Sequence, residues 1–463
     1  MPPLAYFLYW PWARFFFVGV LIAATLAAQA QPMQGLPVLC GQEVFHWIVQ
    51  KHYPQLHQAF EATFEACRAN AALGFSQERS PYVIPVVFHV VWKNPEENLH
   101  DSILINQIDV LNEDYNRQNA DTNNLRSIFR HVAGNARIRF ELHEIRRVKT
   151  NANFQFNLLS GELLTNLKNS AQGGSNAKDP SRYLNIWICR IQPLMIFGIP
   201  AGQILGFAFP PNNLPNWPAN SGAPSPGQDG VVLDFRTVGR NNPNPMPNPI
   251  GGGNLTIRGR TATHEIGHYL GLRHIWGDGD FLGTNNCNQS DGIDDTPFAN
   301  SQSQFDCNKN RNTCLKIEPF YGSDMPDLVE NFMDYSSESC VNMFTRGQVN
   351  LMHAVLQGPR KQLVQSSSNL DLGSQPMSHP MFYPNPTEGS SFWVSIPPEW
   401  LPCQLSIWSI DGRLAVERSF ALLSDREEWL RESLESTNLR SGWYVARFQK
   451  DNRCWTTSLC VLK

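Results

Sequence analysis

The sequence has little net charge and, beyond its N-terminus, no long hydrophobic run. Its 37 Lys and Arg residues nearly balance its 41 Asp and Glu residues, which leaves a formal net charge of -4 at pH 7. Such a balance argues against nucleic acid and against a strongly charged partner. Without a second long apolar run, we expect no transmembrane span in the mature chain. Its 463 residues, 42% of them hydrophobic, are enough for two or three globular domains.

The first 30 residues have the pattern of a secretory signal peptide. A lone Arg14 precedes an apolar run over residues 15–27, and Ala28-Gln29-Ala30 then fits a cleavage site. A membrane anchor is the alternative, but the run is short for a span. All ten cysteines follow this segment, so an oxidising compartment and disulfide bonds are expected.

The strongest chemical signal lies between residues 264 and 274, in the letters HEIGHYLGLRH. On an α-helix, His264 and His268 lie one turn apart on the same face and can share a small cation. His274 would lie about 9 Å further along a continued helix, at roughly 1.5 Å per residue, so the chain must turn before it. Gly271 is the residue that can make this turn, because glycine adopts positive φ at low steric cost.

This arrangement predicts a catalytic zinc site. Three neutral imidazoles, from His264, His268 and His274, leave a fourth position on zinc for water. Zinc lowers the pKa of such a water towards about 7, and Glu265 can take its proton as general base. The alternative is a surface helix that merely carries histidines, and the joint presence of Gly271 and His274 argues against it.

Residues 31–80 are helix-compatible and moderately polar, and we interpret them as a pro-segment between the signal and the zinc motif. Cys40, near the start of this segment, offers a thiolate that can occupy the open zinc position and hold the enzyme latent. A disulfide between Cys40 and Cys67 is the alternative. Chemistry alone does not separate these two interpretations.

Strands and helices alternate before the zinc motif, which indicates an α/β sheet. Residues 83–92 form a continuous apolar run typical of a strand buried on both faces. Residues 104–115 have helical spacing, and residues 136–145 and 183–189 are strand candidates. Residues 205–209 are a further short strand candidate, and an edge strand near a cleft could pair with an extended peptide.

Loops dominate on both sides of the zinc motif. Residues 236–254, with repeated Asn-Pro and three consecutive glycines, form a polar loop without periodicity. Residues 291–296, DGIDDT, form an acidic knot without the full spacing of an EF-hand, so a calcium site and a solvated acidic turn are both open. Downstream, Met333 and Tyr335 lie in the letters NFMDY, and either residue alone is more often structural.

Together, HEIGHYLGLRH and NFMDY resemble the metzincin zinc endopeptidases, and their surroundings resemble the pappalysin branch of that family. The resemblance covers roughly residues 81–360 and includes YVIPVVFHVVW, LNIWIC, GRTATHEIGH, DDTP and ESCVNMFTRGQ. It implies a deep cleft between an upper α/β subdomain and an irregular lower one. It also implies His264, His268 and His274 as zinc ligands, with Glu265 as general base.

The resemblance further implies roles for residues that follow the zinc ligands. Met333 would form the Met-turn beneath the zinc, and Tyr335 would help to stabilise the tetrahedral oxyanion. Glu338 stands where relatives carry an aspartate that selects a basic residue just after the scissile bond, which predicts Arg or Lys at P1′. Asp291 and Thr296 match calcium-binding positions of this branch.

The same resemblance places four cysteines in two disulfides, Cys287 with Cys314 and Cys307 with Cys340. It also matches Cys40 to the pro-segment cysteine that blocks zinc in latent forms. That match favours a latency switch over a disulfide for Cys40.

The C-terminal part of the sequence has a different texture. Residues 363–380, with three consecutive serines, indicate a linker. Residues 381–463 contain short alternating runs separated by turn signals such as Asp411-Gly412, which predict a small β-sandwich. The block from YPNPT through IDGR and LRSGWY to the terminal VLK resembles the C-terminal sorting domain of type IX secretion cargo. This resemblance implies the type IX machinery as a partner, whereas a passive or sugar-binding sandwich is the alternative.

The sequence therefore predicts an α+β protein with a metzincin catalytic domain at residues 81–362 and a C-terminal β-sandwich. The catalytic domain is expected to have a twisted mixed sheet, an active-site helix and an irregular lower subdomain. The predicted function is that of a secreted, monomeric zinc endopeptidase with a structural calcium ion, acting on proteins or peptides. A competing interpretation from another class is a binding or adhesion protein whose metzincin domain is inactive, and the intact ligands and base argue against it.

Overall fold

The computed structural model describes residues 40–72, 81–157, 160–196, 199–211, 226–248, 252–277, 287–303, 305–365, 380–383, 391–397, 400–421, 430–435, 439–451 and 453–461. The predicted signal peptide, most of the predicted linker, and the letters PNPT of the sorting motif lie outside these residues. Within the described part of the chain, no helix combines the length and the apolar character that a membrane span needs.

Two helices open the described chain, α2 (Gly41–His52) and α3 (Pro54–Ala71). They confirm the helical character expected of this region. The sulfur of Cys40 caps α2 by accepting from the N–H of Gln42, and Pro54 begins α3 at a position where no N–H is needed. In the folded chain, α2 contacts strand β9 of the central sheet, and α3 contacts the later helix α6.

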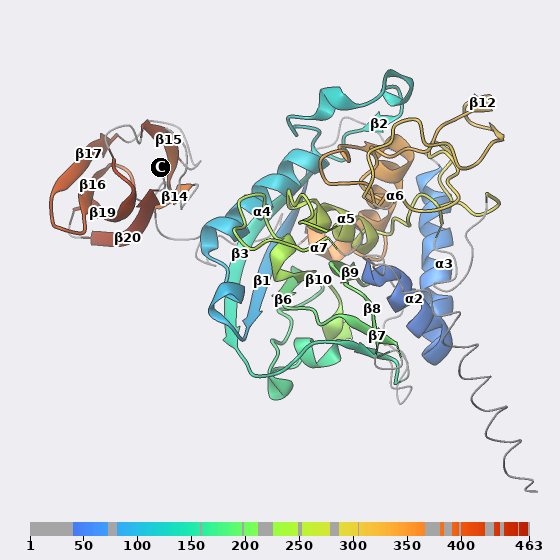
Figure 1. The fold of residues 1–463 in the computed structure, drawn as a ribbon, viewed down its shortest axis with the longest axis horizontal. Helices are drawn as coiled ribbons and strands as arrows, with labels where there is room; N and C mark the ends of the chain where they lie inside the picture. The colour runs from blue at the N-terminus through green and yellow to red at the C-terminus, as the bar shows by residue number, and fades with distance from the viewer. Residues whose placement is uncertain are drawn as a thin grey trace, which may run out of the picture.

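A five-stranded sheet forms the centre of the larger body, in the order β3-β1-β6-β10-β9 (Figure 1). Four strands run parallel, and β9 pairs antiparallel with β10 at the edge. The strands predicted at residues 83–92, 136–145, 183–189 and 205–209 are confirmed, and the last of these lies at the edge of the sheet. No sequence pattern predicted β10. The strands are β1 (Tyr82–Trp92), β3 (Ile138–Lys149), β6 (Leu184–Cys189), β9 (Gly206–Ala208) and β10 (Val231–Asp234).

Both faces of this sheet are buried, because its side chains alternate between two hydrophobic cores. On β6, Ile186 and Ile188 belong to the core that contains α4 (Asp101–Tyr115) and α5 (Arg260–Tyr269). Trp187 of the same strand belongs to the second core, to which α2 contributes its apolar side. This double burial is the physical reason for the continuous apolar runs in the sequence.

Irregular chain follows α5, as expected for the region after the zinc motif. The disulfides Cys287–Cys314 and Cys307–Cys340 hold this part together, which confirms both predicted pairs. Two helices, α6 (Arg346–Gln357) and α7 (Lys361–Gln365), then return the chain to the main body.

The short strands are β2 (Ala133–Gly134), β4 (Phe156–Asn157), β5 (Glu162–Leu163), β7 (Leu194–Ile196), β8 (Ile199–Gly202), β11 (Ile317–Glu318), β12 (Ser323–Asp324) and β13 (Phe344–Thr345).

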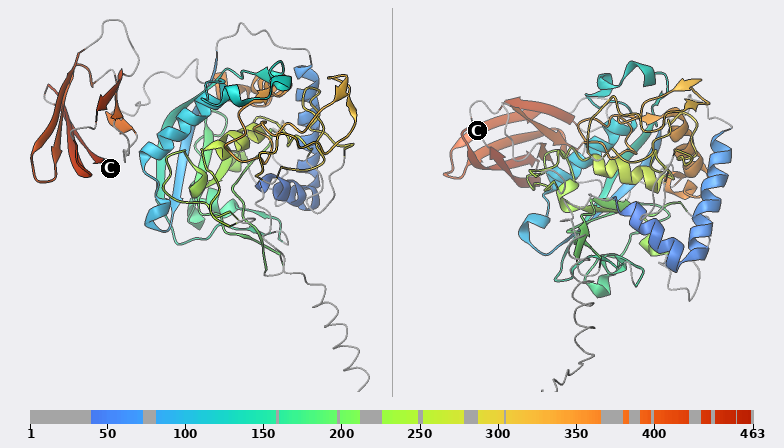
Figure 2. Two further views of the ribbon diagram at one scale, coloured as in Figure 1. Left: turned by 45° about the horizontal axis from the view of Figure 1, so that its top comes forward. Right: turned by 45° about the vertical axis from the view of Figure 1, so that its right-hand side comes forward.

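The last part of the chain forms two antiparallel sheets that share one hydrophobic core (Figure 2). Their strand orders are β14-β15-β18 and β17-β16-β19-β20. Gly412 makes the turn between β16 and β17 with φ 81°, in agreement with the predicted Asp-Gly turn. The strands are β14 (Met381–Tyr383), β15 (Ser391–Ile396), β16 (Cys403–Ser409), β17 (Leu414–Phe420), β18 (Leu430–Glu435), β19 (Gly442–Lys450) and β20 (Arg453–Val461).

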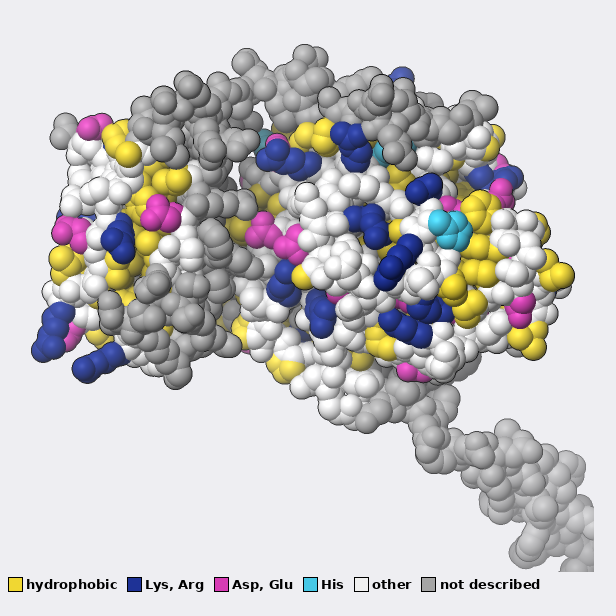
Figure 3. All heavy atoms as spheres, turned by 90° about the horizontal axis from the view of Figure 1, so that it is seen from above, with side chains coloured by type: hydrophobic (Ala, Val, Ile, Leu, Met, Phe, Trp, Pro, Cys, Tyr) yellow, Lys and Arg dark blue, Asp and Glu magenta, His cyan; other side chains and the backbone are white. Residues whose placement is uncertain are grey.

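Charged side chains of both signs are visible on one face of the molecule. On the face shown in Figure 3, Lys and Arg side chains are interspersed with Asp, Glu and hydrophobic side chains. This dispersal is consistent with the small net charge of the sequence.

Candidate active site

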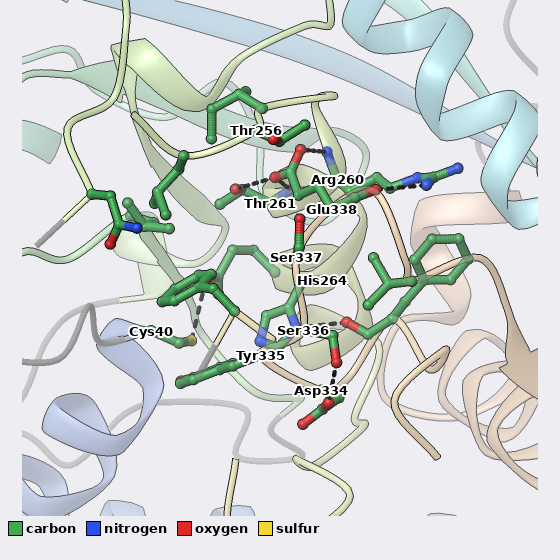
Figure 4. Close-up of a pocket in the computed structure, with 18 of the residues that line it drawn as sticks. Cys40, Thr256, Arg260, Thr261, His264, Asp334, Tyr335, Ser336, Ser337 and Glu338 are labelled. Atoms are coloured by element: carbon green, nitrogen blue, oxygen red, sulfur yellow. Dashed lines mark hydrogen bonds between the residues drawn. The ribbon is translucent and has the colours of Figure 1, made fainter. Parts of the chain in front are cut away.

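Helix α5, which carries the zinc motif, begins without a side-chain cap of its own. Its N-cap residue is Gly259, with φ 80°. Glu338 supplies the cap instead, because its carboxylate accepts from the backbone N–H groups of Arg258, Arg260 (3.1 Å) and Thr261 (2.8 Å). The Thr261 hydroxyl donates to the same carboxylate at 2.8 Å (Figure 4). A negative group at this end also suits the helix dipole, so Glu338 fixes the start of the helix.

A buried ionic network joins α5 to α4. The Arg260 guanidinium donates twice to Asp121 at 2.6 Å and lies 3.5 Å from Asp114 of α4. The Thr263 hydroxyl donates to the other oxygen of Asp114 at 2.8 Å. Burial raises the pKa of Asp114 to about 7, although the charge of Arg260 opposes the shift. No pattern in the sequence predicted this network, which connects residues far apart in the chain.

The three histidines of the motif converge on one buried point. The Nε2 atoms of His264 and His274 each lie 3.1 Å from Nε2 of His268. Gly271 turns the chain between the helix and His274 with φ 92°, as predicted. All three imidazoles are buried, so the point at which they meet is screened from bulk solvent.

This arrangement fits a divalent cation. Nδ1 of His264 lies 2.7 Å from the carbonyl oxygen of Phe332, and Nδ1 of His268 lies 2.8 Å from that of Leu272. Because a carbonyl only accepts, each Nδ1 carries the proton and each Nε2 presents a lone pair. Lone pairs that face each other at 3.1 Å repel unless a cation lies between them, and such carbonyl contacts are typical of metal-binding histidines. Sγ of Cys40 lies within the same group of potential ligands.

Met333 lies against the helix between the first two histidines. A Cβ atom on Gly267 would collide with Sδ of Met333, so the close packing requires glycine at this position. Met333 is fully buried, and its N–H donates to Asn331 at 2.9 Å. The structure thus packs Met333 against the helix that carries His264 and His268.

Cys40 lies in a pocket that His264 also lines (Figure 4), and its thiol is hydrogen-bonded to Glu265. The Cys40 thiol donates to Oε1 of Glu265 at 3.2 Å, and Oε2 of Glu265 has no hydrogen-bond partner among the described residues. Burial raises the pKa of Glu265 to about 8. Burial, and then the charge of Glu265, raise the pKa of Cys40. The pocket therefore disfavours negative charge unless a cation lies beside it.

Tyr335 completes this pocket from the segment after the disulfide-linked loops. Its ring packs on His264, His274 and Trp276, with centroid distances of 5.5, 4.9 and 4.9 Å. Its hydroxyl is buried and has no hydrogen-bond partner in the described part of the chain. Burial, and then the nearby Cys40, raise the pKa of Tyr335. The hydroxyl is therefore protonated and able to donate to a group that enters the pocket.

Two further segments form walls of this region. The pocket is lined by Asn248 and Asn254 of the polar loop at residues 236–254, and by residues 255–257, which follow that loop. The start of α2 covers the edge strand β9, because a Cβ on Gly41 would lie only 2.7 Å from Cβ of Phe207. The start of α2 therefore packs against the strand that was predicted to pair with a peptide.

The predicted calcium residues lie in a separate loop, outside this pocket. The Thr296 hydroxyl donates to Oδ1 of Asp291 at 2.6 Å, and burial raises the pKa of Asp291. Oδ2 of Asp291 and Oδ1 of Asp295 are buried and have no partner among the described residues. Asp295 was not singled out in the sequence. Two buried carboxylate oxygens without donors fit a cation that prefers oxygen ligands.

Cys40 and Cys67 are both free and buried in this structure. The alternative of a disulfide between them is therefore wrong. The physical reason is that Cys40 lines the pocket beside His264 and donates a hydrogen bond to Glu265, whereas Cys67 lines another pocket between α3 and the end of α5.

Comparisons with known proteins agree with this geometry. The family model Peptidase_M43, described as pregnancy-associated plasma protein-A, matches residues 254–357. An extracellular metalloprotease of Uncinocarpus reesii is 31% identical over 271 residues, which cover 57% of this chain and 72% of that protein. An extracellular metalloprotease of Arthroderma benhamiae is 27% identical over 301 residues, which cover 64% of this chain and 80% of that protein. The solved structure of a Tannerella forsythia promirolysin mutant is 32% identical, with a TM-score of 0.54, and covers 72% of this chain and 98% of that chain.

Proposed function

This chain belongs to the Peptidase_M43, or pappalysin, family of metalloendopeptidases, and we propose that it is a secreted zinc endopeptidase made as a latent precursor. The observation that carries the proposal is the convergence of three Nε2 atoms beside the buried carboxyl of Glu265. A binding or adhesion protein has no need for both a metal-ligand cluster and a buried base.

The residues of the pocket have separate tasks in peptide-bond hydrolysis. His264, His268 and His274 would hold zinc through their Nε2 atoms. When bound, zinc acts as a Lewis acid on a peptide carbonyl and lowers the pKa of a water ligand. Glu265 accepts a proton from the attacking water and later delivers it to the leaving amine. The hydroxyl of Tyr335 donates to the oxygen on which negative charge develops.

The N-terminal helix pair acts as the pro-segment and keeps the precursor latent. Cys40 would serve as a ligand at the open metal position, since its sulfur lies in one group of potential metal ligands with the three histidines and donates a hydrogen bond to Glu265. The start of α2 also covers β9, where an extended substrate would pair. The similar solved structure of promirolysin supports a precursor form in this family.

Specificity for Arg or Lys at P1′ is assigned to Glu338. This residue lines the same pocket as His264 and Glu265. Because its carboxylate also caps α5, a basic substrate side chain would share it with backbone N–H groups. A carboxylate has about four lone-pair positions, and these already accept four hydrogen bonds, so a basic side chain would be attracted by the charge of Glu338 and would replace one of the present donors.

A structural calcium ion is assigned to the loop at residues 291–296. Asp291 would supply Oδ2, which is buried without a donor, and Thr296 would supply its hydroxyl oxygen. The unpartnered oxygen of Asp295 adds a third candidate ligand. Calcium at this loop would relieve the repulsion of buried carboxylates.

Secretion and sorting complete the proposal. Relatives from Uncinocarpus reesii and Arthroderma benhamiae are named extracellular metalloproteases, which supports a secreted enzyme. The C-terminal pair of sheets would form a β-sandwich that directs type IX export, as the motif resemblance implies, with release or attachment at the cell surface. Deletion of residues 382–463 is expected to retain the protease in the periplasm, as measured by cell fractionation. Normal export of the truncated chain would contradict the sorting role.

The proposed catalysis is tested with the enzyme freed of its pro-segment and a protein substrate. A zinc chelator should abolish cleavage, and added zinc should restore it. Glu265→Ala should retain zinc but lose activity by about 10²–10⁴-fold or more, as expected for loss of a general base. Glu141→Ala, which removes an exposed glutamate on β3, is the matched control and should retain activity. A wild-type enzyme that binds zinc yet cleaves nothing in a broad peptide set would contradict the proposal.

A further inference from the structure

A second group of potential metal ligands lies on the N-terminal helix pair. His46 belongs to α2, and His57 and Glu61 belong to α3. One ligand atom of each residue lies within 4.8 Å of the others, and all three residues are partly buried. His57 and Glu61 are four residues apart, so they share one face of α3. The hairpin of the two helices therefore brings two nitrogen donors and one oxygen donor together.

The two imidazoles have the mutual geometry of the catalytic histidines in this same chain. The ring centroids of His46 and His57 lie 4.8 Å apart, and the ring planes make an angle of 86°. The corresponding values are 4.7 Å and 82° for His264 and His268, and 4.5 Å and 85° for His268 and His274. The pair His264 and His274 differs, with 5.3 Å and 32°, so the arrangement of His46 and His57 matches two of the three ring pairs of the zinc motif.

His57 also has a polar atom that the protein leaves unsatisfied. Its Nδ1 is buried and has no hydrogen-bond partner among the described residues. Burial lowers the pKa of His57, which keeps the ring neutral and able to bind a metal near neutral pH. A bound ion, which fixes the ring and its tautomer, would offset the free energy of burying this group.

We propose that His46, His57 and Glu61 form a second zinc site, in which one ion joins α2 to α3. Two imidazoles and a carboxylate suit zinc, whereas calcium and magnesium prefer sites made of oxygen. Tetrahedral ligands at about 2.0–2.2 Å from zinc lie about 3.4 Å apart, and the ligand atoms here lie within 4.8 Å of one another, so each pair would have to approach by at most about 1.4 Å. The two helices meet at an angle at the flank of the larger body (Figures 1 and 2) and contact each other.

The site bears on latency through two contacts, one made by Glu61 in the middle of α3 and one by Cys40 at the start of α2. Both oxygens of Glu61 accept from Nη2 of Arg273 at 2.9 Å, and Arg273 directly precedes His274. Cys40, in turn, caps the N-terminus of α2. The ion would therefore link α2, which Cys40 caps, to α3, which binds Arg273 through Glu61. Slower release of the pro-segment in the presence of zinc follows from this link, and that consequence rests on the proposed function.

Metal counting tests the site without reference to activity. The full-length Glu265→Ala chain, in which self-processing is blocked, is equilibrated with buffered micromolar zinc and its metal content is measured by inductively coupled plasma mass spectrometry. We expect two zinc ions per chain, falling to one after His46→Gln or His57→Gln. His52→Gln, on the same helix as His46 but outside the cluster, is the matched control and should retain two.

One zinc ion in the parent chain, or two in both cluster variants, would overturn the proposal. Circular dichroism checks that each variant is folded. Cobalt(II) titration of the parent chain needs no variant: two equivalents should bind before the visible absorption saturates, and saturation at one equivalent would overturn the proposal.

The link to latency is tested separately with the wild-type chain. Conversion of the precursor to the mature form, followed by gel electrophoresis, should become several-fold slower at zinc concentrations that fill the second site. In His57→Gln, zinc should have no such effect. Equal slowing in both chains would overturn the link to latency but not the site. A wild-type chain that cleaves nothing would contradict the proposed function, while the metal count would still decide the site.

Discussion

The sulfur of Cys40 lies 3.2 Å from Oε1 of Glu265 and in one group with the three histidines of the zinc motif. One cysteine thus faces both the proposed base and the proposed metal position. Its neighbour Gly41 packs so closely on Phe207 that a side chain there would collide with the edge strand. The start of α2 therefore contacts both Glu265, through Cys40, and the edge strand β9.

Removal of this thiol should release latency. We expect the Cys40→Ala precursor to cleave a reporter peptide at least about tenfold faster than the wild-type precursor, because the proposed sulfur ligand is lost. A tenfold change corresponds to about 1.4 kcal/mol of blocking interaction. Cys67→Ala removes the other buried free cysteine of the helix pair and should leave the precursor latent. Equal latency of Cys40→Ala and wild type would contradict the switch.

Glu338 has two proposed tasks that one substitution can separate. In Glu338→Gln, the amide oxygen can accept at only one of the two positions that the carboxylate oxygens use, the NH2 group faces the donors at the other position, and the charge is gone. We expect kcat/KM for substrates with Arg or Lys at P1′ to fall at least about tenfold relative to substrates with Leu, and stability to fall by about 1 kcal/mol. Cleavage of a peptide library, read by mass spectrometry, and a thermal melt measure the two effects.

Glu338→Asp is the matched control, because it keeps the charge and should keep the preference for basic residues. A lowered melting temperature with an unchanged P1′ profile would assign Glu338 to helix capping alone.

Calcium should stabilise the loop that contains Asp291. Millimolar calcium is expected to raise the melting temperature of the Glu265→Ala chain by about 2–4 °C, which corresponds to about 1 kcal/mol for a domain of this size. Asp291→Asn should abolish the rise, because it removes the charge of a buried ligand. Asp294→Asn changes an exposed neighbour and should preserve it. An equal rise in both variants would exclude this loop as the binding site.

The parts of the site that sequence could predict are those within one short motif. Helical spacing placed His264 and His268 on one face, and the need for a turn identified Gly271, whose φ is 92°. The apolar run at residues 83–92 predicted a strand buried on both faces, because its composition alone shows that neither face meets water.

The remaining parts depend on contacts between distant segments. The cap that Glu338 provides to α5 joins residues 77 or more positions apart, and no local pattern encodes such a distance. The group of His46, His57 and Glu61 exists only once α2 folds back on α3. The strand β10 has four residues, too few for periodicity to identify it.

A buried histidine should make the stability of the chain depend on pH. His89 of β1 has a relative exposure of 0% and lies 2.7 Å from the Ser175 hydroxyl and 2.9 Å from the Asn185 side-chain oxygen. Burial lowers its pKa from 6.5 to about 4. The unfolded chain therefore takes up a proton below pH 6.5 while the native chain does not. Stability from this residue is complete above pH 6.5 and is lost as the pH falls towards 4.

The difference between the pKa of His89 in the unfolded and the folded chain corresponds to about 3 kcal/mol of unfolding free energy, which is lost between pH 6.5 and pH 4. Urea unfolding of the Glu265→Ala chain between pH 4.5 and pH 7.5 measures the effect. His89→Gln should flatten the pH dependence by this amount, even where it lowers stability throughout, because glutamine does not titrate. His131→Gln replaces an exposed histidine and should follow the parent curve. Parallel curves for His89→Gln and the parent would show that His89 titrates equally in the folded and unfolded chains.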